Sequence, residues 1–305
     1  MSLLNIGMSG LSASHASLVT TGNNISNVDT VGYSRQQTVQ GTKGSIQYGN
    51  VFIGTGTTLA DVRRVYNSYL DAQLQTSTSL NSDAQAYLGQ ATQVNKLLSD
   101  SGTGVTKSLQ AFFSSLQTLA GNSNDNAARQ ALLTNAQGLS SRFNAISGQL
   151  KQQGSYINDQ LGSMADQVNK LASTVAAYNK KISEVSGSGG TPNELLDQRN
   201  ETIRQLNELV GTQVTETEGR MDIYLGSGQP LVVGDTVNKL RVAADPADPT
   251  RSSIIMDRNG SSIDITDVMS GGEMGGLVRY RNDVLTPAVN GLGRIAMVVS
   301  DQVNK

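Results

Sequence analysis

Residues 132–185, LLTNAQGLSSRFNAISGQLKQQGSYINDQLGSMADQVNKLASTVAAYNKKISEV, carry apolar side chains at alternating steps of three and four residues. This spacing places one apolar stripe along a helix that packs against other helices. We expect a single helix about 85 Å long, because a helix rises 1.5 Å per residue. The stripe changes phase once, near Gly154, which we interpret as a stutter. A break into two helices at Gly154 is the competing interpretation, because glycine weakens a helix.

The same spacing recurs outside this stretch. It predicts a helix over residues 4–25, an antiparallel pair over 87–98 and 105–119 joined near Ser101–Gly104, and a final helix over 285–299 that Gly271-Gly272 and Gly275-Gly276 precede. The sequence TPNE at residues 191–194 has the form of a capping box, so a further helix is expected to start there and to end at Gly211.

Two stretches change to a period of two residues, which is typical of strands. They are residues 36–64 and residues 212–273, and both contain turn dipeptides rich in glycine, asparagine and aspartate. The predicted fold is mainly α, an elongated bundle of long heptad-patterned helices with a small antiparallel β module. Its divisions are an N-terminal assembly helix and turn (1–35), a short β segment (36–64), the helical bundle (65–211 with 274–305) and the β module (212–273).

Composition excludes several classes of function. The 305 residues include no cysteine and one histidine, and the net charge is -2. The absence of cysteine therefore excludes disulfides, thiolate catalysis and the usual zinc sites. A nucleic-acid partner is disfavoured because the sequence has no basic cluster. No apolar run reaches the ~18 residues that span a membrane. We predict no membrane partner and no cofactor.

The same inventory argues against an enzyme. A serine triad would need a general base, and His15 lies on the apolar stripe of a predicted helix, where a packed or interface histidine is the simpler interpretation. A hydrolase with two carboxylates remains open, using for example Asp222 or Glu216 of the predicted β module, although no sequence feature singles out a pair. Asp197-Gln198-Arg199 is interpreted as a surface ion-pair network of little energetic value. No catalytic or metal-binding residue is predicted.

The N-terminal helix is the candidate functional element. Its stripe has no charged residues beside it and no evident partner nearby in sequence, as expected of a surface kept for assembly. We expect it to be mobile in the free monomer. The predicted interface residues are Leu4, Met8, Leu11, Leu18 and Ile25, and the turn that ends the helix is predicted at Asn27, Gly32 and Tyr33.

Several motifs give a resemblance to a known family. TTGNNISN (residues 20–27) and GYSRQ (32–36) resemble the N-terminal signature of bacterial flagellar axial proteins. The second motif is similar to that of the FlgK family of hook-associated proteins, the first of the hook-filament junction subunits. Further stretches that resemble this family are FSSLQ (113–117), AARQAL (127–132), PNELLDQR (192–199) and GGL (275–277).

The resemblance implies a structural subunit of the flagellum, secreted through the flagellar type III apparatus without a cleaved signal. Its implied partners are hook subunits, the second junction protein, copies of itself in a ring and an export chaperone. Family members pair their terminal helices, so the C-terminal helix and the chaperone site are expected beyond Lys305. Another axial subunit and a secreted coiled-coil adhesin or effector are the alternatives.

Overall fold

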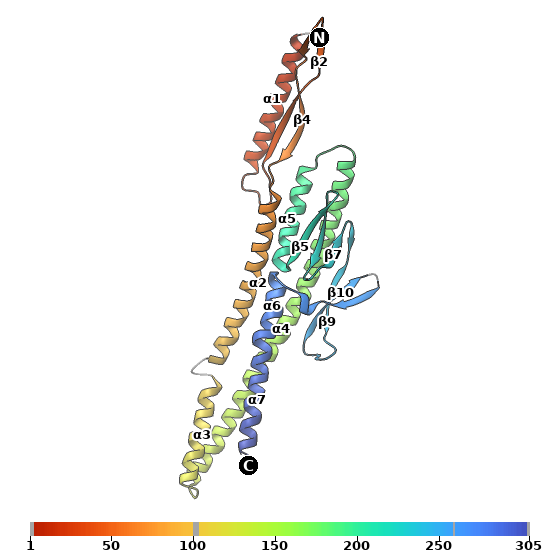
Figure 1. Ribbon diagram of the computed structural model, residues 1–305. Helices are drawn as coiled ribbons and strands as arrows, with labels where there is room; N and C mark the ends of the chain where they lie inside the picture. The colour runs from red at the N-terminus through yellow and green to blue at the C-terminus, as the bar shows by residue number, and fades with distance from the viewer. Residues whose placement is uncertain (1–2, 100–103, 259, 304–305) are drawn as a thin grey trace.

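The computed structural model describes residues 3–99, 104–258 and 260–303. The molecule is long and narrow, and it is mainly helical with a small β part (Figure 1). The N- and C-termini lie toward opposite ends of its long axis (Figure 1). Residues 3–64, which we call the N-terminal segment, form one end. Residues 68–303, which we call the body, form the rest. None of the described helices is long and apolar enough to cross a membrane.

Helix α4 (Asn126–Gly187) is the central helix of the body, on which α3, α5 and the sheets pack. Its 62 residues form one continuous helix about 93 Å long, so the predicted single helix is confirmed and the competing interpretation, a break at Gly154, is wrong. The side chain of Asp125 caps its start by accepting a hydrogen bond from the Ala127 amide at 2.8 Å. The predicted stripe supplies its buried side chains, which include Ile146, Leu150, Ile157, Leu161, Val168 and Val175.

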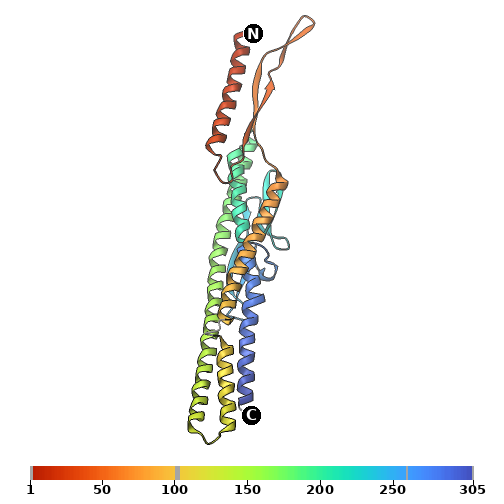
Figure 2. The ribbon, with the colours of Figure 1, turned by 90° about the vertical axis from the view of Figure 1, so that its left-hand side faces the viewer.

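Helices α2 (Ser68–Ser99) and α3 (Val105–Gly121) do not form the predicted antiparallel pair. Helix α3 continues in the direction of α2 and turns back into α4, against which it packs (Figures 1 and 2). The prediction fails because α3 packs on α4, where Phe112 is buried near Leu139 and Phe143, while α2 packs on α6. The predicted connection at residues 101–103 lies outside the described residues.

Helix α5 (Asn193–Leu209) lies beside α4 and ends just before Gly211, as predicted. The predicted capping box is wrong, because the Thr191 hydroxyl lies 3.0 Å from Asp61 Oδ1 and does not bond the first turn of the helix. Pro192 occupies the N-cap position.

The last helical stretch runs through α6 (Gly272–Tyr280), a π-helical turn η2 (Arg281–Leu285) and α7 (Thr286–Val303). The sequence predicted that Gly275 and Gly276 precede this helix, but both lie inside α6. A Cβ atom at Gly276 would lie 2.3 Å from the Asp83 carbonyl oxygen, so glycine is needed for the close approach of α6 to α2.

The predicted β module consists of two antiparallel sheets. One contains β5 (Thr212–Thr217), β6 (Arg220–Leu225), β7 (Gln229–Val233) and β8 (Thr236–Val237) in that order. The other has the order β11 (Ser261–Asp264), β10 (Ser252–Arg258) and β9 (Lys239–Ala244), followed by the 3-10 turn η1 (Thr266–Val268). Both contribute apolar side chains, among them Ile223, Leu231 and Ile254, to the core shared with α4.

Three asparagines of α4 bind the backbone of these sheets and their loops. Asn169 bonds both the amide and the carbonyl of Leu240, each at 2.7 Å. Asn179 bonds the amide and carbonyl of Met221 and the carbonyl of Gly234, and Asn158 bonds the Ser252 amide and the Thr250 carbonyl. The side-chain amide thus takes the place of a neighbouring strand.

The N-terminal segment pairs α1 (Leu3–Ser26) with a long β ribbon. Strands β1 (Gln36–Thr42) and β4 (Thr57–Arg64) are antiparallel and lie along α1, and β2 (Ser45–Tyr48) and β3 (Val51–Gly54) extend the ribbon to its tip (Figure 1). The strands predicted over residues 36–64 are therefore present.

Candidate functional site

Helix α1 has one covered face and one open face. The covered face is small and polar: Ala13 is buried, Ser17 Oγ lies 3.0 Å from Thr38 Oγ1, and Ser9 Oγ accepts a hydrogen bond from the Thr57 amide. The expectation that α1 has no partner nearby in sequence is therefore wrong for this face. Small side chains allow the ribbon to approach the helix closely.

The open face carries every residue predicted for the interface. Their exposed fractions run from 54% for Met8 to 74% for Leu4, and none is brought into the core of the body. His15 is also exposed. The exposed apolar residues of α1 also include Leu3 and Val19, at 90% and 58%. Such a row of apolar side chains on a monomer is typical of an interaction surface.

The tip of the ribbon adds exposed apolar residues that the sequence reasoning missed. Tyr48, Val51, Phe52 and Ile53 are each more than half exposed. The sequence signal is the group of apolar residues at positions 46, 48 and 51–53 within the predicted β segment. The ribbon has only two strands there, so neither face is covered.

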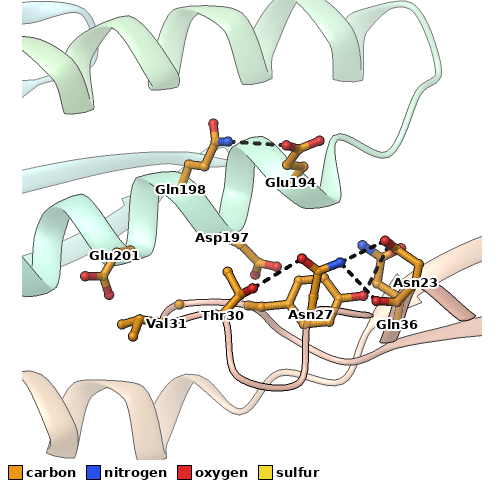
Figure 3. Close-up of a pocket in the computed structure, with 11 residues that line it drawn as sticks. Asn23, Asn27, Thr30, Val31, Gln36, Glu194, Asp197, Gln198 and Glu201 are labelled. Carbon is orange, nitrogen blue, oxygen red and sulfur yellow. Dashed lines mark hydrogen bonds between the residues drawn. The ribbon is translucent and has the colours of Figure 1, made fainter. Parts of the chain in front are cut away.

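The predicted turn is held by amide side chains (Figure 3). Asn24 bonds both the amide and the carbonyl of Gln36 at 2.8 Å, and it accepts a hydrogen bond from the Tyr33 hydroxyl at 2.8 Å. Asn27 donates to the Asn23 carbonyl at 2.9 Å. The bonds between Asn24 and Gln36 hold the start of β1 against the C-terminal end of α1. Burial, and to a lesser extent the charge of Asp197, raises the pKa of Tyr33, so this hydroxyl stays protonated.

The turn meets the start of α5 at a buried ion pair. Asp197 Oδ1 accepts from Arg64 Nη1 at 2.7 Å, and Asp197 Oδ2 accepts from the Ser34 amide at 2.9 Å. The side chains of Arg64 and Asp197 are only 11% and 8% exposed. The prediction of a surface network at 197–199 is wrong, because residues far away in sequence cover this side chain.

Gly32 completes this contact. Its φ of +81° favours glycine, and a Cβ atom there would lie 2.8 Å from the Glu201 Cβ. A cleft of about 260 Å³ remains between the turn and α5, lined by side chains that include Asn27, Tyr33, Glu194 and Asp197 (Figure 3). Residues 28–35, 61–66 and 191–201, which contain these contacts, are called the joint below.

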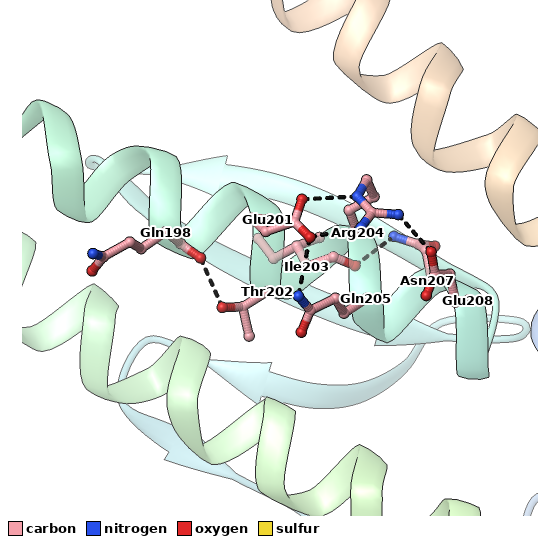
Figure 4. Close-up of polar contacts among 8 residues, drawn as sticks. All are labelled: Gln198, Glu201, Thr202, Ile203, Arg204, Gln205, Asn207 and Glu208. Carbon is pink, nitrogen blue, oxygen red and sulfur yellow. Dashed lines mark hydrogen bonds and ion pairs between the residues drawn. The ribbon is translucent and has the colours of Figure 1, made fainter. Parts of the chain in front are cut away.

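Helix α5 continues the polar surface away from the joint (Figure 4). Arg204 pairs with Glu201 at 2.6 Å and with Glu208 at 2.5 Å. The hydrogen bond from Arg204 lowers the pKa of Glu201, which stays ionised at neutral pH. Arg199 points to the opposite side, is 1% exposed and donates to Gly219 O and Asn179 Oδ1. Its burial lowers its pKa to about 10.

The carboxylates considered for a hydrolase do not converge. Strands β5 and β6 pair Thr215 with Asp222 and Glu216 with Met221, so Asp222 and Glu216 lie on opposite faces of the sheet. Asp222 is used structurally, since it accepts from the Gly234 amide at 2.7 Å. Within the described ranges, no three His, Cys, Asp or Glu side chains are grouped to hold a metal ion.

The body matches a family model over most of its length. Residues 91–305 match the model described as the flagellar hook-associated protein FlgK helical domain. The chain belongs to the FlgK family. Residues 4–33, which are α1 and the turn, match a second model described as flagella basal body rod protein. The two matched ranges meet at the joint, where Gly32 of the second lies against Glu201 of the first.

Individual FlgK relatives agree with the family match. The chain is 35% identical to flagellar hook-associated protein 1 of Salmonella typhimurium and 34% identical to that of Escherichia coli, over 99% of this chain. It spans about 56% of the length of these relatives. The solved structure of the flagellar hook junction protein FlgK from Burkholderia pseudomallei has a TM-score of 0.72 and 33% identity, covering 76% of this chain and 43% of that one.

Proposed function

We propose that this chain is part of a structural subunit of the bacterial flagellum, located outside the cell at the junction between hook and filament. The similarity to hook-associated proteins over 99% of the chain carries this proposal. The proposed role is structural and not catalytic. The relatives are flagellar components, and Asp222 and Glu216 lie on opposite faces of their sheet.

Assembly is proposed to use the open face of α1. The apolar row of Leu4, Met8, Leu11, Leu18 and Ile25 is uncharged and would bury its side chains against terminal helices of the same or neighbouring subunits. Burying one such side chain contributes roughly 1.5–3 kcal/mol. Asn27, Gly32 and Tyr33 would then turn the chain from the assembly helix into the outer part of the subunit.

The proposed partners follow from the same position. They are hook subunits on one side, the second hook-filament junction protein on the other, and copies of the chain in a ring. An export chaperone would act before assembly, at a site not in this chain. We also propose that the assembled subunit keeps the divisions 1–35, 36–64, 65–211 with 274–305, and 212–273, the last two built around one shared core.

A deletion strain tests the function. Removing the gene is expected to leave hooks without filaments and to release flagellin into the medium, and the full-length gene should restore filaments. Normal filaments in the deletion strain would overturn the proposal. An adhesin or effector predicts that outcome, and a rod or hook subunit predicts the loss of the hook itself.

A second comparison tests the assembly face. The double variant Leu11→Asp/Leu18→Asp is expected to be exported but absent from isolated hooks, because buried carboxylates are costly in an apolar interface. Ser173→Asp, at an exposed position of α4, is the matched control and should restore filaments. Normal incorporation of the α1 variant would contradict the proposed interface.

A further inference from the structure

The contact between the N-terminal segment and the body contains little apolar packing. Among the described residues, the apolar core includes none that precedes Ala86. Of the aliphatic side chains at the joint, Val28, Val31 and Val65 are 76%, 73% and 49% exposed, and Val62, Leu195 and Leu196 are only partly buried. Hydrophobic burial therefore does not fix the direction in which the N-terminal segment leaves the body.

Polar contacts from a short stretch of the body take its place. Asn193 Nδ2 donates to the Val62 carbonyl at 2.6 Å, and the Thr191 hydroxyl lies 3.0 Å from Asp61 Oδ1. Asn193 and Asp197 are one helical turn apart, so both face the ribbon. The joint thus depends on one face of the first turns of α5.

Asp197 is the only residue of this face, within the described ranges, that bonds both chain crossings of the joint. Its two oxygens bind the Ser34 amide after α1 and the Arg64 guanidinium at the end of β4. The two crossings are themselves bonded, since the Val65 amide donates to the Arg35 carbonyl at 2.8 Å. Hydrogen bonds to an ionised group are about twice as strong as neutral ones.

We propose that Asp197 is the positioning residue of the joint: its carboxylate, clamped between the Ser34 amide and Arg64, sets the angle between the N-terminal segment and the body. The inference deepens the proposed function, because that angle would present the open face of α1 to neighbouring subunits. Its physical basis is nevertheless a property of the isolated chain.

Paired spin labels measure this angle directly. The chain contains no cysteine, so Ser12→Cys on α1 and Ser183→Cys on α4, both exposed, give one label on each side of the joint. The distance distribution is expected to be narrow in the otherwise unchanged chain. It should broaden in Asp197→Asn, which weakens both clamped contacts, and in Arg64→Gln, which leaves the Asp197 charge without its cation.

Two controls separate positioning from general damage. Arg241→Gln removes an ion pair with Asp257 in the body, in which the two side chains are 49% and 43% exposed, and should leave the distribution unchanged. Labels at Ser183 and Ser227, both exposed in the body, should report one unchanged distance in every variant. The double variant Arg64→Gln/Asp197→Asn should broaden the distribution no more than Asp197→Asn alone, because that change already weakens the contact with Arg64.

Amide exchange gives a second readout. Exchange at the Ser34 amide is expected to be about tenfold faster in Asp197→Asn, which corresponds to the loss of one ordinary hydrogen bond. An unchanged distance distribution together with unchanged exchange at Ser34 would overturn the inference. Neither result depends on the flagellar role, so failure here leaves the deletion experiment above unaffected, and failure there leaves this test valid.

Discussion

Gly276 lies against the carbonyl oxygen of Asp83, close enough that a Cβ atom at this glycine would be 2.3 Å from that oxygen. The contact joins α6 to α2, two helices almost 200 residues apart in sequence, through their backbones. It follows that α2 has no freedom to shift along α6 without opening this contact, and that the pairing tolerates no larger side chain.

Gly276→Ala is therefore expected to lower the free energy of unfolding by about 2 kcal/mol or more, since the clash is with backbone and cannot be relieved by a side-chain rotation. Gly148→Ala in α4 is the matched control. Its Cβ atom meets nothing within 4 Å, so the same change should raise helix stability by about 0.5–1 kcal/mol. Urea unfolding followed by circular dichroism measures both, and equal effects would contradict the contact.

Gly32→Ala should act locally. A side chain at φ +81° is strained and would also press on Glu201, so the turn is expected to separate from α5. Hydrogen exchange in residues 28–35 should rise while exchange in α4 stays unchanged. Gly22→Ala, inside α1 with open space around it, should instead slow exchange in α1. Uniformly faster exchange across the body in Gly32→Ala would be inconsistent with a local joint.

Asn179→Ala is expected to lower the free energy of unfolding more than Asn158→Ala does. Asn179 is fully buried, and its loss leaves the amide and carbonyl of Met221, the carbonyl of Gly234 and the buried guanidinium of Arg199 without this partner. About 4 kcal/mol is expected, from roughly 1 kcal/mol for each of these bonds. Asn158 makes two such bonds at a more exposed position, where water can replace it. Thermal unfolding of the two variants compares them, and a larger loss for Asn158→Ala would reject this ranking.

Glu201 is expected to make the free energy of unfolding depend on pH in the acid range. Its pKa is lowered from 4.5 in the folded chain, first by the hydrogen bond from Arg204, so the unfolded chain binds the proton more readily. Its contribution is therefore present above pH 4.5 and is lost as the pH falls through the lower folded value. Wild type and Glu201→Gln should differ in unfolding free energy at neutral pH and converge in acid. A constant difference would show that Glu201 does not titrate in this way.

The sequence was most informative where structure depends on neighbours along the chain. The stripe from Leu132 to Val185 predicted α4, because the spacing of apolar residues on one helix is a local property. The strands of 36–64 and 212–273 were found for the same reason. The relative directions of α2 and α3 were wrong, since helical spacing carries no information on which helix a stripe will meet.

The site shows the same division. The open face of α1 was readable as a row of uncharged, evenly spaced residues. The role of Asp197 was not readable, because its partners Arg64 and Ser34 are 133 and 163 residues away. Gly275 and Gly276 were misassigned for a related reason: a glycine that permits close helix contact and one that forms a linker look alike until the facing helix is known.

The unbroken length of α4 has a mechanical consequence. A continuous helix of about 93 Å runs through the packed core of the body, whereas the joint is held by a few hydrogen bonds. A load applied to α1 would therefore be absorbed first at the joint, where the contacts are polar and few. The body would move as a stiff lever, and the N-terminal segment would pivot against it.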